Sequence, residues 1–172
     1  NWEMFTPQGL AKTVTPHALT RADIAGIVAD FARGAAHARA AGFDGVEVHG
    51  ANGYLLDQFL QSSTNLRTDA YGGSIENRAR LMLEVTDAVI SVWGAGRVGM
   101  HLAPRGDSHT MGDSDPAATF GYVAKELGKR QIAFIFTREH FNAPALTPAL
   151  KQAFGGAFIA NEQLTAETAQ QV

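Results

Sequence analysis

The feature that most constrains this sequence is a regular alternation of short apolar runs with longer segments of helical period. The runs span four or five residues and are rich in β-branched and aromatic side chains, which favour strands. They occupy 46–49, 98–102, 132–136 and 157–160. Helical periodicity covers 21–41, 75–93, 116–130 and 147–154, and a further helix begins after Thr165. This alternation predicts parallel βαβ units with helices covering the sheet.

The turns after the predicted strands exclude two common nucleotide-binding folds of this class. No strand is followed by a GxGxxG turn, and the sequence contains no GxxxxGK[ST] loop. A (β/α)8 barrel is therefore the leading architecture. A complete barrel has eight strands in typically ~250 residues, whereas this chain of 172 residues supplies about four βα units. We expect a single partial barrel domain over residues 1–172, with an irregular lead-in at 1–19.

Composition limits the partners and the chemistry. The formal net charge is −3 and the Lys and Arg residues are scattered, so the chain lacks the positively charged surface that attracts the phosphates of nucleic acids. No apolar run approaches the ~18 residues of a membrane span, and the first residues lack the pattern of a secretory signal. The lack of cysteine excludes disulfides, thiolate metal sites and cysteine nucleophiles. We therefore expect a cytoplasmic protein that binds neither nucleic acid nor membranes.

The alternation of side chains along the strands brings two histidines together. Val46 and Val48 should face the helices that cover the first strand. Glu47 and His49 then point to the opposite face, toward the barrel axis, and the same alternation turns His101 inward on the next strand. Both histidines would lie near the carboxyl ends of neighbouring strands, which is where barrel enzymes build their active sites.

Polar groups suited to acid–base chemistry directly follow the first of these strands. Asn52 and Tyr54 come within five residues of His49, so one short loop carries an imidazole, an amide and a phenol. An imidazole and an amide can both donate hydrogen bonds to one carbonyl oxygen, and a phenol can deliver a proton. The simpler alternative is a buried histidine satisfied by the backbone, with Tyr54 in the core.

A longer run around these residues is similar to a known family. The segment HGANGYLLDQFL at 49–60 is followed by NLRTD at 65–69 and by YGGSIENRAR at 71–80. Together they closely resemble the Old Yellow Enzyme family of flavin-dependent ene-reductases. The resemblance extends over essentially the whole chain, but it corresponds to the second half of the family's barrel, roughly the fourth to seventh of its strands.

The resemblance implies an FMN-bound (β/α)8 barrel that takes hydride from NAD(P)H. The hydride would pass to the β-carbon of an activated alkene, such as an α,β-unsaturated carbonyl or nitro compound. The resemblance assigns the binding of the substrate oxygen to His49 and Asn52, and the donation of a proton to the α-carbon to Tyr54. Donors aimed at that oxygen would stabilise the negative charge that hydride addition builds there.

The resemblance also implies which residues contact FMN. They are His49, then His101, which stands where the family usually has an arginine, and Asn161, Glu162 and Gln163 in the turn that holds the FMN phosphate. A half-barrel cannot shield a flavin from both sides, and its outer strands leave two open edges. We therefore expect a complementary barrel half or a second chain to complete the site.

Two other interpretations stay open from the sequence. In a metal-dependent hydrolase barrel, His49 and His101 would be ligands, with Glu47 or Asp107 as a third. Alternatively, the chain is a catalytically silent, truncated or split half-barrel that keeps the family's sequence without its cofactor. His101 and the missing strands favour the silent half-barrel. The presence of all three of His49, Asn52 and Tyr54 favours a working enzyme.

Overall fold

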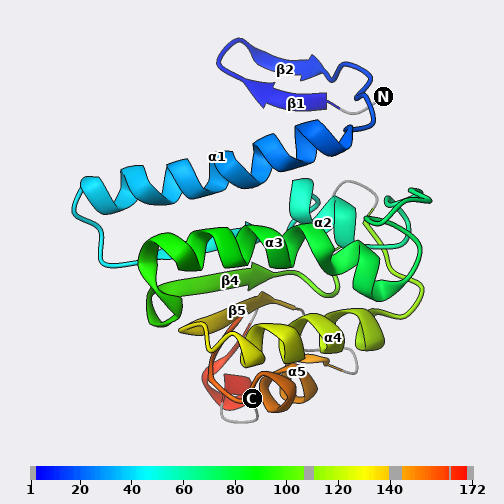
Figure 1. The fold of residues 1–172 in the computed structure, drawn as a ribbon. Coiled ribbons are helices and arrows are strands. Elements are labelled where there is room, and N and C mark those ends of the chain that lie inside the picture. Colours follow the sequence, from blue (N-terminus) through cyan, green and yellow to red (C-terminus); the bar gives the residue numbers. More distant parts are fainter. Residues whose placement is uncertain (1–2, 107–110, 140–144, 163, 170–172) are drawn as a thin grey trace.

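The computed structural model describes residues 3–106, 111–139, 145–162 and 164–169 (Figure 1). Its elements are β1 (Glu3–Thr6), β2 (Gly9–Lys12), α1 (Arg21–Ala40), β3 (Val46–Gly50), α2 (Leu55–Leu60), α3 (Ile75–Trp93), the 3-10 turn η1 (Ala95–Arg97), β4 (Val98–Leu102), α4 (Pro116–Lys129), β5 (Phe134–Arg138), α5 (Thr147–Phe154), β6 (Ala157–Asn161) and α6 (Ala166–Ala169). The strands β3 to β6 form a parallel sheet in chain order. Helix α3 contacts α1 on one side and α4 on the other, and α4 contacts α5. The arrangement confirms four consecutive βα units.

Side-chain caps set the boundaries of the helices. A capping box begins α1, because the Thr20 hydroxyl accepts a hydrogen bond from the Asp23 N–H and the Asp23 carboxylate accepts one from the Thr20 N–H. Ser74 caps α3 through its hydroxyl, and Asp115 caps α4 with Pro116 in the first turn. The bounds of α1, α3, α4 and α5 confirm the four helix predictions to within one residue.

Two segments differ from the sequence prediction. The lead-in at 1–19, expected to be irregular, contains the antiparallel hairpin of β1 and β2, which lies beyond α1 from the sheet (Figure 1). Its strands have four residues each, which is too short for a clear period, and Gly9 turns the chain with a φ of 107°. The strand predicted at 132–136 lies two residues later, at β5, because no turn residue marks its start within that apolar run.

The register of the parallel sheet sorts its side chains onto two faces. Val48, Met100 and Ile135 face the helices and are at most 3% exposed, as part of the core that the sheet shares with α3 and α4. The opposite face is here called the inner face. Its rows of Cα partners are His49, His101, Phe136 and Ile159, and next to them Glu47, Gly99, Phe134 and Ala157. The predicted inward direction of Glu47, His49 and His101 is thus confirmed.

Packing on the inner face is tight in the middle of the sheet and open at its sides. An added Cβ at Gly99 would lie 2.3 Å from the Phe134 ring, so that ring occupies the space that a larger residue would need. Toward the outer strands, His49 is exposed and Ile159 is 46% exposed. The inner face of this half-barrel is therefore accessible from the β3 and β6 sides.

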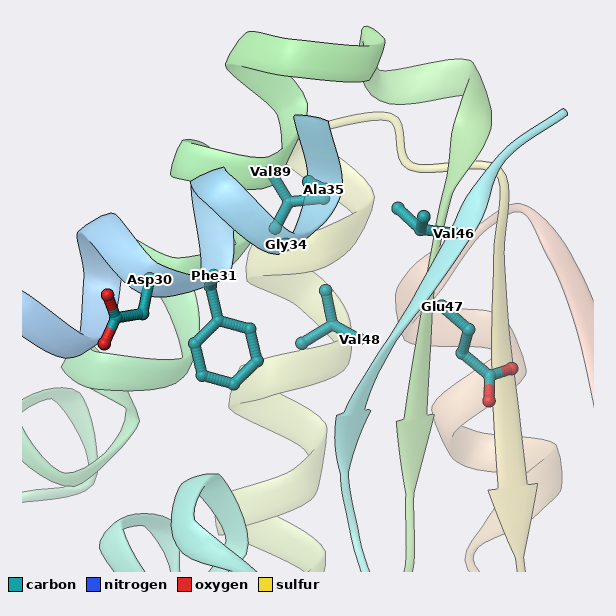
Figure 2. Close-up of a pocket in the computed structure, with 8 residues that line it drawn as sticks. All are labelled: Asp30, Phe31, Gly34, Ala35, Val46, Glu47, Val48 and Val89. Atoms are coloured by element: carbon teal, nitrogen blue, oxygen red, sulfur yellow. The ribbon is translucent and has the colours of Figure 1, made fainter. Parts of the chain in front are cut away.

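The outer edge of β3 adjoins an apolar groove. Within the described residues β3 and β6 are the outer strands, each paired on one side. The groove lies between β3 and α1 and has a volume of about 390 Å³. Figure 2 shows Phe31 and Val48 facing each other across it, while the Glu47 carboxylate lies on the other side of the strand. An unpaired strand edge beside an apolar groove is a surface on which a further segment can pack.

A buried ion pair joins α3 to the segment before α4. Arg78 Nη1 donates to Asp113 Oδ2 at 2.9 Å, and the two side chains are 6% and 0% exposed. Asp113 also accepts hydrogen bonds from the Ser62 N–H and the Thr119 hydroxyl. Three segments therefore depend on one buried carboxylate.

Among the described residues no helix combines the length and the apolar character that a membrane crossing requires.

We expect Arg78→Met to lower the free energy of unfolding by about 3–5 kcal/mol, because the substitution leaves the Asp113 carboxylate buried without its cation. Urea denaturation followed by circular dichroism measures the change. The matched control is Arg80→Met on the same helix, where the guanidinium is exposed, with an expected loss below about 1 kcal/mol. Equal losses in the two variants would contradict this assignment.

Candidate active site

Two imidazole rings meet on the inner face near the carboxyl ends of β3 and β4. His49 and His101 are register partners, and their Nδ1 atoms lie 3.1 Å apart, which is a hydrogen-bond distance. The His101 ring also lies 4.4 Å from the Phe136 ring between centroids, on the side of β5. His101 is 8% exposed, whereas His49 is accessible from the open side of the sheet. One ring is thus held inside the site and the other borders its mouth.

Both imidazoles are held in the neutral form. Burial lowers the pKa of His101 to about 4, and the charges of His49 and Arg138 act in the same direction. Burial also lowers the pKa of His49. A neutral imidazole offers one N–H donor and one acceptor nitrogen. At neutral pH the pair therefore carries hydrogen-bonding groups rather than positive charge.

The loop after β3 carries the other two predicted site residues. Tyr54 directly precedes α2, is 54% exposed, and has its ring 5.3 Å from the His49 ring between centroids. Asn52 adopts a φ of 58°, in the left-handed region that asparagine tolerates better than most residues. The alternative that placed Tyr54 in the core is wrong, because the ring is exposed beside His49.

A buried carboxylate fixes the turn that holds this loop. Asp57 accepts hydrogen bonds from the Gly53 N–H at 2.9 Å and from Gln61 Nε2 at 2.8 Å. The side chain is fully buried, and burial raises its pKa to about 6. Because Gly53 stands between Asn52 and Tyr54 in the chain, its bond to Asp57 determines how the backbone presents both neighbours.

The run at 65–73, which contributed to the resemblance, has a structural role. The Asn65 amide donates to the Tyr71 carbonyl at 2.7 Å, and Arg67 pairs with Asp69 at 2.7 Å. An added Cβ at Gly72 would lie 2.1 Å from the Arg67 carbonyl oxygen, so the close approach of the two backbones requires glycine. These contacts fold the long connection between α2 and α3 onto itself.

Arg138 joins the loop after β3 to the end of β6, and the sequence prediction missed it. Its Nη1 donates to Asn52 Oδ1 at 3.2 Å, its Nη2 donates to Glu162 Oε1 at 3.0 Å, and its Nε lies 2.9 Å from Glu162 Oε2. The prediction ended this strand at 136. Extending the alternation by two residues from Phe136 places Arg138 on the inner face. The guanidinium fixes the Asn52 amide with its oxygen turned toward the positive charge.

The residues predicted to contact a cofactor are brought together in two groups. His49 and His101 form the imidazole pair. Asn161 is the last residue of β6 and the register partner of Arg138, and Glu162 follows it. Glu162 has a φ of 101°, a conformation that favours glycine, and its carboxylate is held by Arg138. Gln163 lies outside the described residues.

The metal interpretation has limited support from the geometry. Glu47 Oε1 lies 4.0 Å from His101 Nδ1. Among the described residues, no group of three or more His, Asp or Glu side chains is arranged to hold a metal ion. Asp107, the other third ligand considered, lies outside the described residues.

Comparisons with known proteins identify relatives of this chain. Residues 4–170 match the profile of the NADH:flavin oxidoreductase / NADH oxidase family. The chain is 52% identical over 131 residues to a probable flavin mononucleotide-dependent alkene reductase of Leishmania infantum, covering 76% of this chain and 36% of that protein. It is 46% identical over 156 residues to 12-oxophytodienoate reductase 1 of Oryza sativa subsp. japonica, covering 84% of this chain and 40% of that protein.

Solved structures show the same likeness. Morphinone reductase in complex with tetrahydroNAD superposes with a TM-score of 0.90 at 43% identity, covering 98% of this chain and 48% of that one. The old yellow enzyme homologue from Zymomonas mobilis superposes with a TM-score of 0.94 at 37% identity, covering 99% of this chain and 50% of that one. The chain is therefore a partial (β/α)8 barrel that spans about half the length of these structures. It belongs to the NADH:flavin oxidoreductase / NADH oxidase family, the Old Yellow Enzyme family that its motif resembles.

We expect NMR titration of the histidine ring protons to give a midpoint near pH 4 for His101. The ordinary value is 6.5, so the unfolded state binds more protons than the folded state between these two values. The contribution of His101 to the free energy of unfolding therefore falls as the pH drops through this window, by up to about 3 kcal/mol.

Stability measurements on wild type and His101→Phe isolate this contribution. The raised pKa of Asp57 acts in the opposite sense between its ordinary value and about 6, because there the folded state binds more protons. Asp57 is present in both proteins, so its effect cancels in their difference. We expect the stability of wild type relative to the variant to decrease on acidification. A difference that is flat between pH 4 and 6.5 contradicts the burial of this imidazole.

Proposed function

We propose that this chain forms the substrate-binding part of an FMN-dependent oxidoreductase that reduces activated C=C bonds, using hydride from NAD(P)H. Its substrates would be α,β-unsaturated carbonyl or nitro compounds. The observation that carries the proposal is the gathering of an imidazole, an amide and a phenol, from His49, Asn52 and Tyr54, at one accessible edge of the inner face. Membership of the family and the names of the relatives, which include alkene and 12-oxophytodienoate reductases, support it.

The roles of these residues follow from their hydrogen-bonding groups. His49 and Asn52 each offer N–H donors, and a carbonyl or nitro oxygen accepts such bonds. These donors stabilise the oxygen more as it gains negative charge than in the bound substrate, which is the requirement for catalysis. The Tyr54 hydroxyl, beside His49 and exposed, is the proton donor to the α-carbon.

The inner face has groups that fit FMN, which when bound supplies the hydride. His101 Nε2 is buried without a hydrogen-bond partner in the described part of the chain, so an N–H donor on the polar edge of a bound ring would satisfy its lone pair. The backbone of Asn161 and Glu162, at the end of β6, would hold the phosphate. Arg138 keeps the Glu162 carboxylate paired. His49, His101, Asn161 and Glu162 are thus the proposed cofactor contacts, and Gln163 stays a prediction.

We also propose that a complementary barrel half, in the same protein or on a second chain, covers the inner face. The open edges of β3 and β6, the groove beside β3 and the exposed Ile159 support this proposal. The exclusion of water that this cover provides strengthens the hydrogen bonds offered by the site. Cytoplasmic location stays a prediction.

A visible absorption spectrum tests the proposed function. The purified protein is mixed with FMN, desalted, reduced anaerobically with NADPH and then treated with 2-cyclohexenone. We expect retained flavin that bleaches with NADPH and recovers its colour with the enone. In Tyr54→Phe, bleaching should be unchanged and recovery slower by about 10²- to 10⁴-fold, because the proton donor is lost. Tyr122→Phe on α4 is the matched control and should behave as wild type. A folded chain that stays colourless would support the silent half-barrel instead.

A double-mutant cycle tests whether Arg138 acts through Asn52. We expect Arg138→Met to lower kcat/KM for the enone about tenfold, which is the effect of losing one hydrogen bond to a charged group. In an Asn52→Ala background, with FMN saturating so that the loss of the Glu162 pairing does not limit flavin content, the same substitution should cost less than about twofold, because the amide that Arg138 orients is already gone. Equal losses in both backgrounds would mean that Arg138 acts independently of Asn52.

A further inference from the structure

We propose that His101 is a positioning residue that fixes the tautomer of His49, so that His49 carries its proton on Nε2. The Nδ1 to Nδ1 contact at 3.1 Å, the buried Nε2 of His101 and the nearby Glu47 carboxylate carry this inference. The tautomer itself is independent of the proposed function. Its consequence for catalysis rests on that function.

The contact between the two Nδ1 atoms allows two arrangements of the neutral pair. A hydrogen bond between them uses a single proton, so one Nδ1 donates and the other accepts. If His101 Nδ1 donates, His49 Nδ1 accepts and the proton of His49 lies on its Nε2. If His49 Nδ1 donates, its Nε2 is a bare acceptor, and His101 must carry its own proton on Nε2.

The burial of His101 Nε2 favours the first arrangement. This atom is buried and has no hydrogen-bond partner in the described residues. In the second arrangement it would be an N–H group without an acceptor, and such buried orphan donors are rarer in folded proteins than acceptors with unused capacity. The first arrangement instead leaves a lone pair at that buried position.

The charges around His101 favour the same arrangement. Glu47 Oε1 lies 4.0 Å from His101 Nδ1, on the neighbouring strand. An ionised carboxylate attracts an N–H proton and repels a nitrogen lone pair, so it places the proton on this Nδ1. Arg138 and His49 both disfavour a second proton on His101, which keeps the ring neutral and able to occupy one tautomer.

The consequence is a defined donor at the mouth of the site. His49 is exposed and lies beside Tyr54. With Nδ1 occupied as an acceptor, its Nε2–H is the group offered to a substrate oxygen. In the opposite tautomer the same atom would present a lone pair and repel that oxygen. His101 therefore decides whether His49 assists or opposes the reaction without itself touching the substrate oxygen.

Nitrogen-15 NMR of the histidine rings tests the tautomer directly in wild type and three variants of position 101. An asparagine amide can donate from about the position of Nδ1, an ionised aspartate can only accept, and a leucine does neither. We expect the proton of His49 on Nε2 in wild type and in His101→Asn. In His101→Asp it should move to Nδ1, and in His101→Leu both tautomers should be populated. A proton on Nδ1 of His49 in wild type overturns the proposal.

The enone assay separates this inference from the proposed function. In protein loaded with FMN and reduced before the enone is added, so that flavin binding and reduction by NADPH do not enter the rate, His101→Asp should react with the enone about 100-fold more slowly than His101→Asn, the usual effect of losing one donor to a developing oxyanion. Equal values, with tautomers that differ as expected, overturn the link to catalysis. If the tautomers follow the prediction and no protein reduces the enone, the proposed function fails while the tautomer assignment stands. Should the aspartate variant not fold, the wild-type, asparagine and leucine spectra still decide the tautomer.

Discussion

The backbone register of the four-stranded parallel sheet is the constraint on which the rest of the molecule depends. It turns Val48, Met100 and Ile135 into the core and, by the same alternation, sets His49, His101 and Phe136 in one row on the other face. A shift of one residue in a single strand would exchange the two sets, exposing apolar side chains and burying polar ones. Core packing against the helices therefore enforces the geometry of the site, although the described ring contacts of the imidazole pair come from the loop after β3 and from β5.

Burial changes the protonation of the groups that this register brings together. In water an imidazole takes up a proton at mildly acidic pH, but burial lowers the pKa of both rings, and for His101 it does so to about 4, so that this ring stays neutral there. A neutral imidazole has one donor and one acceptor nitrogen, whereas both nitrogens of a charged ring donate. The tautomer of a neutral ring therefore decides which group each nitrogen can bind. The same principle operates at Asp57, whose buried carboxylate is held by the Gly53 N–H and fixes the turn between Asn52 and Tyr54.

How much the sequence could predict depends on whether a feature is local. The first residues of α1, α3 and α4 were predictable, because the capping residues Thr20, Ser74 and Asp115 directly precede the helices they cap. The imidazole pair was also predictable, since strand alternation is local and parallel strands end together. Arg138 was not, because its role appears once the start of β5 is known, and packing rather than a turn residue sets that start. The Arg78–Asp113 pair likewise joins residues 35 positions apart, with no local pattern linking them.

Arg138 also shows why the two ends of this site cannot be considered separately. Its guanidinium holds Asn52 at the end of β3 and Glu162 at the end of β6, two strands that are the opposite margins of the sheet. Glu162 sits in a backbone conformation suited to glycine, which costs free energy that the ion pair with Arg138 offsets in part. A ligand that competes for the guanidinium at β6 must therefore also change the restraint on the Asn52 amide at β3. In this fold the loop after β3 and the residue that follows β6 are linked through one side chain, and the strength of that link depends on the ion pair between Glu162 and Arg138.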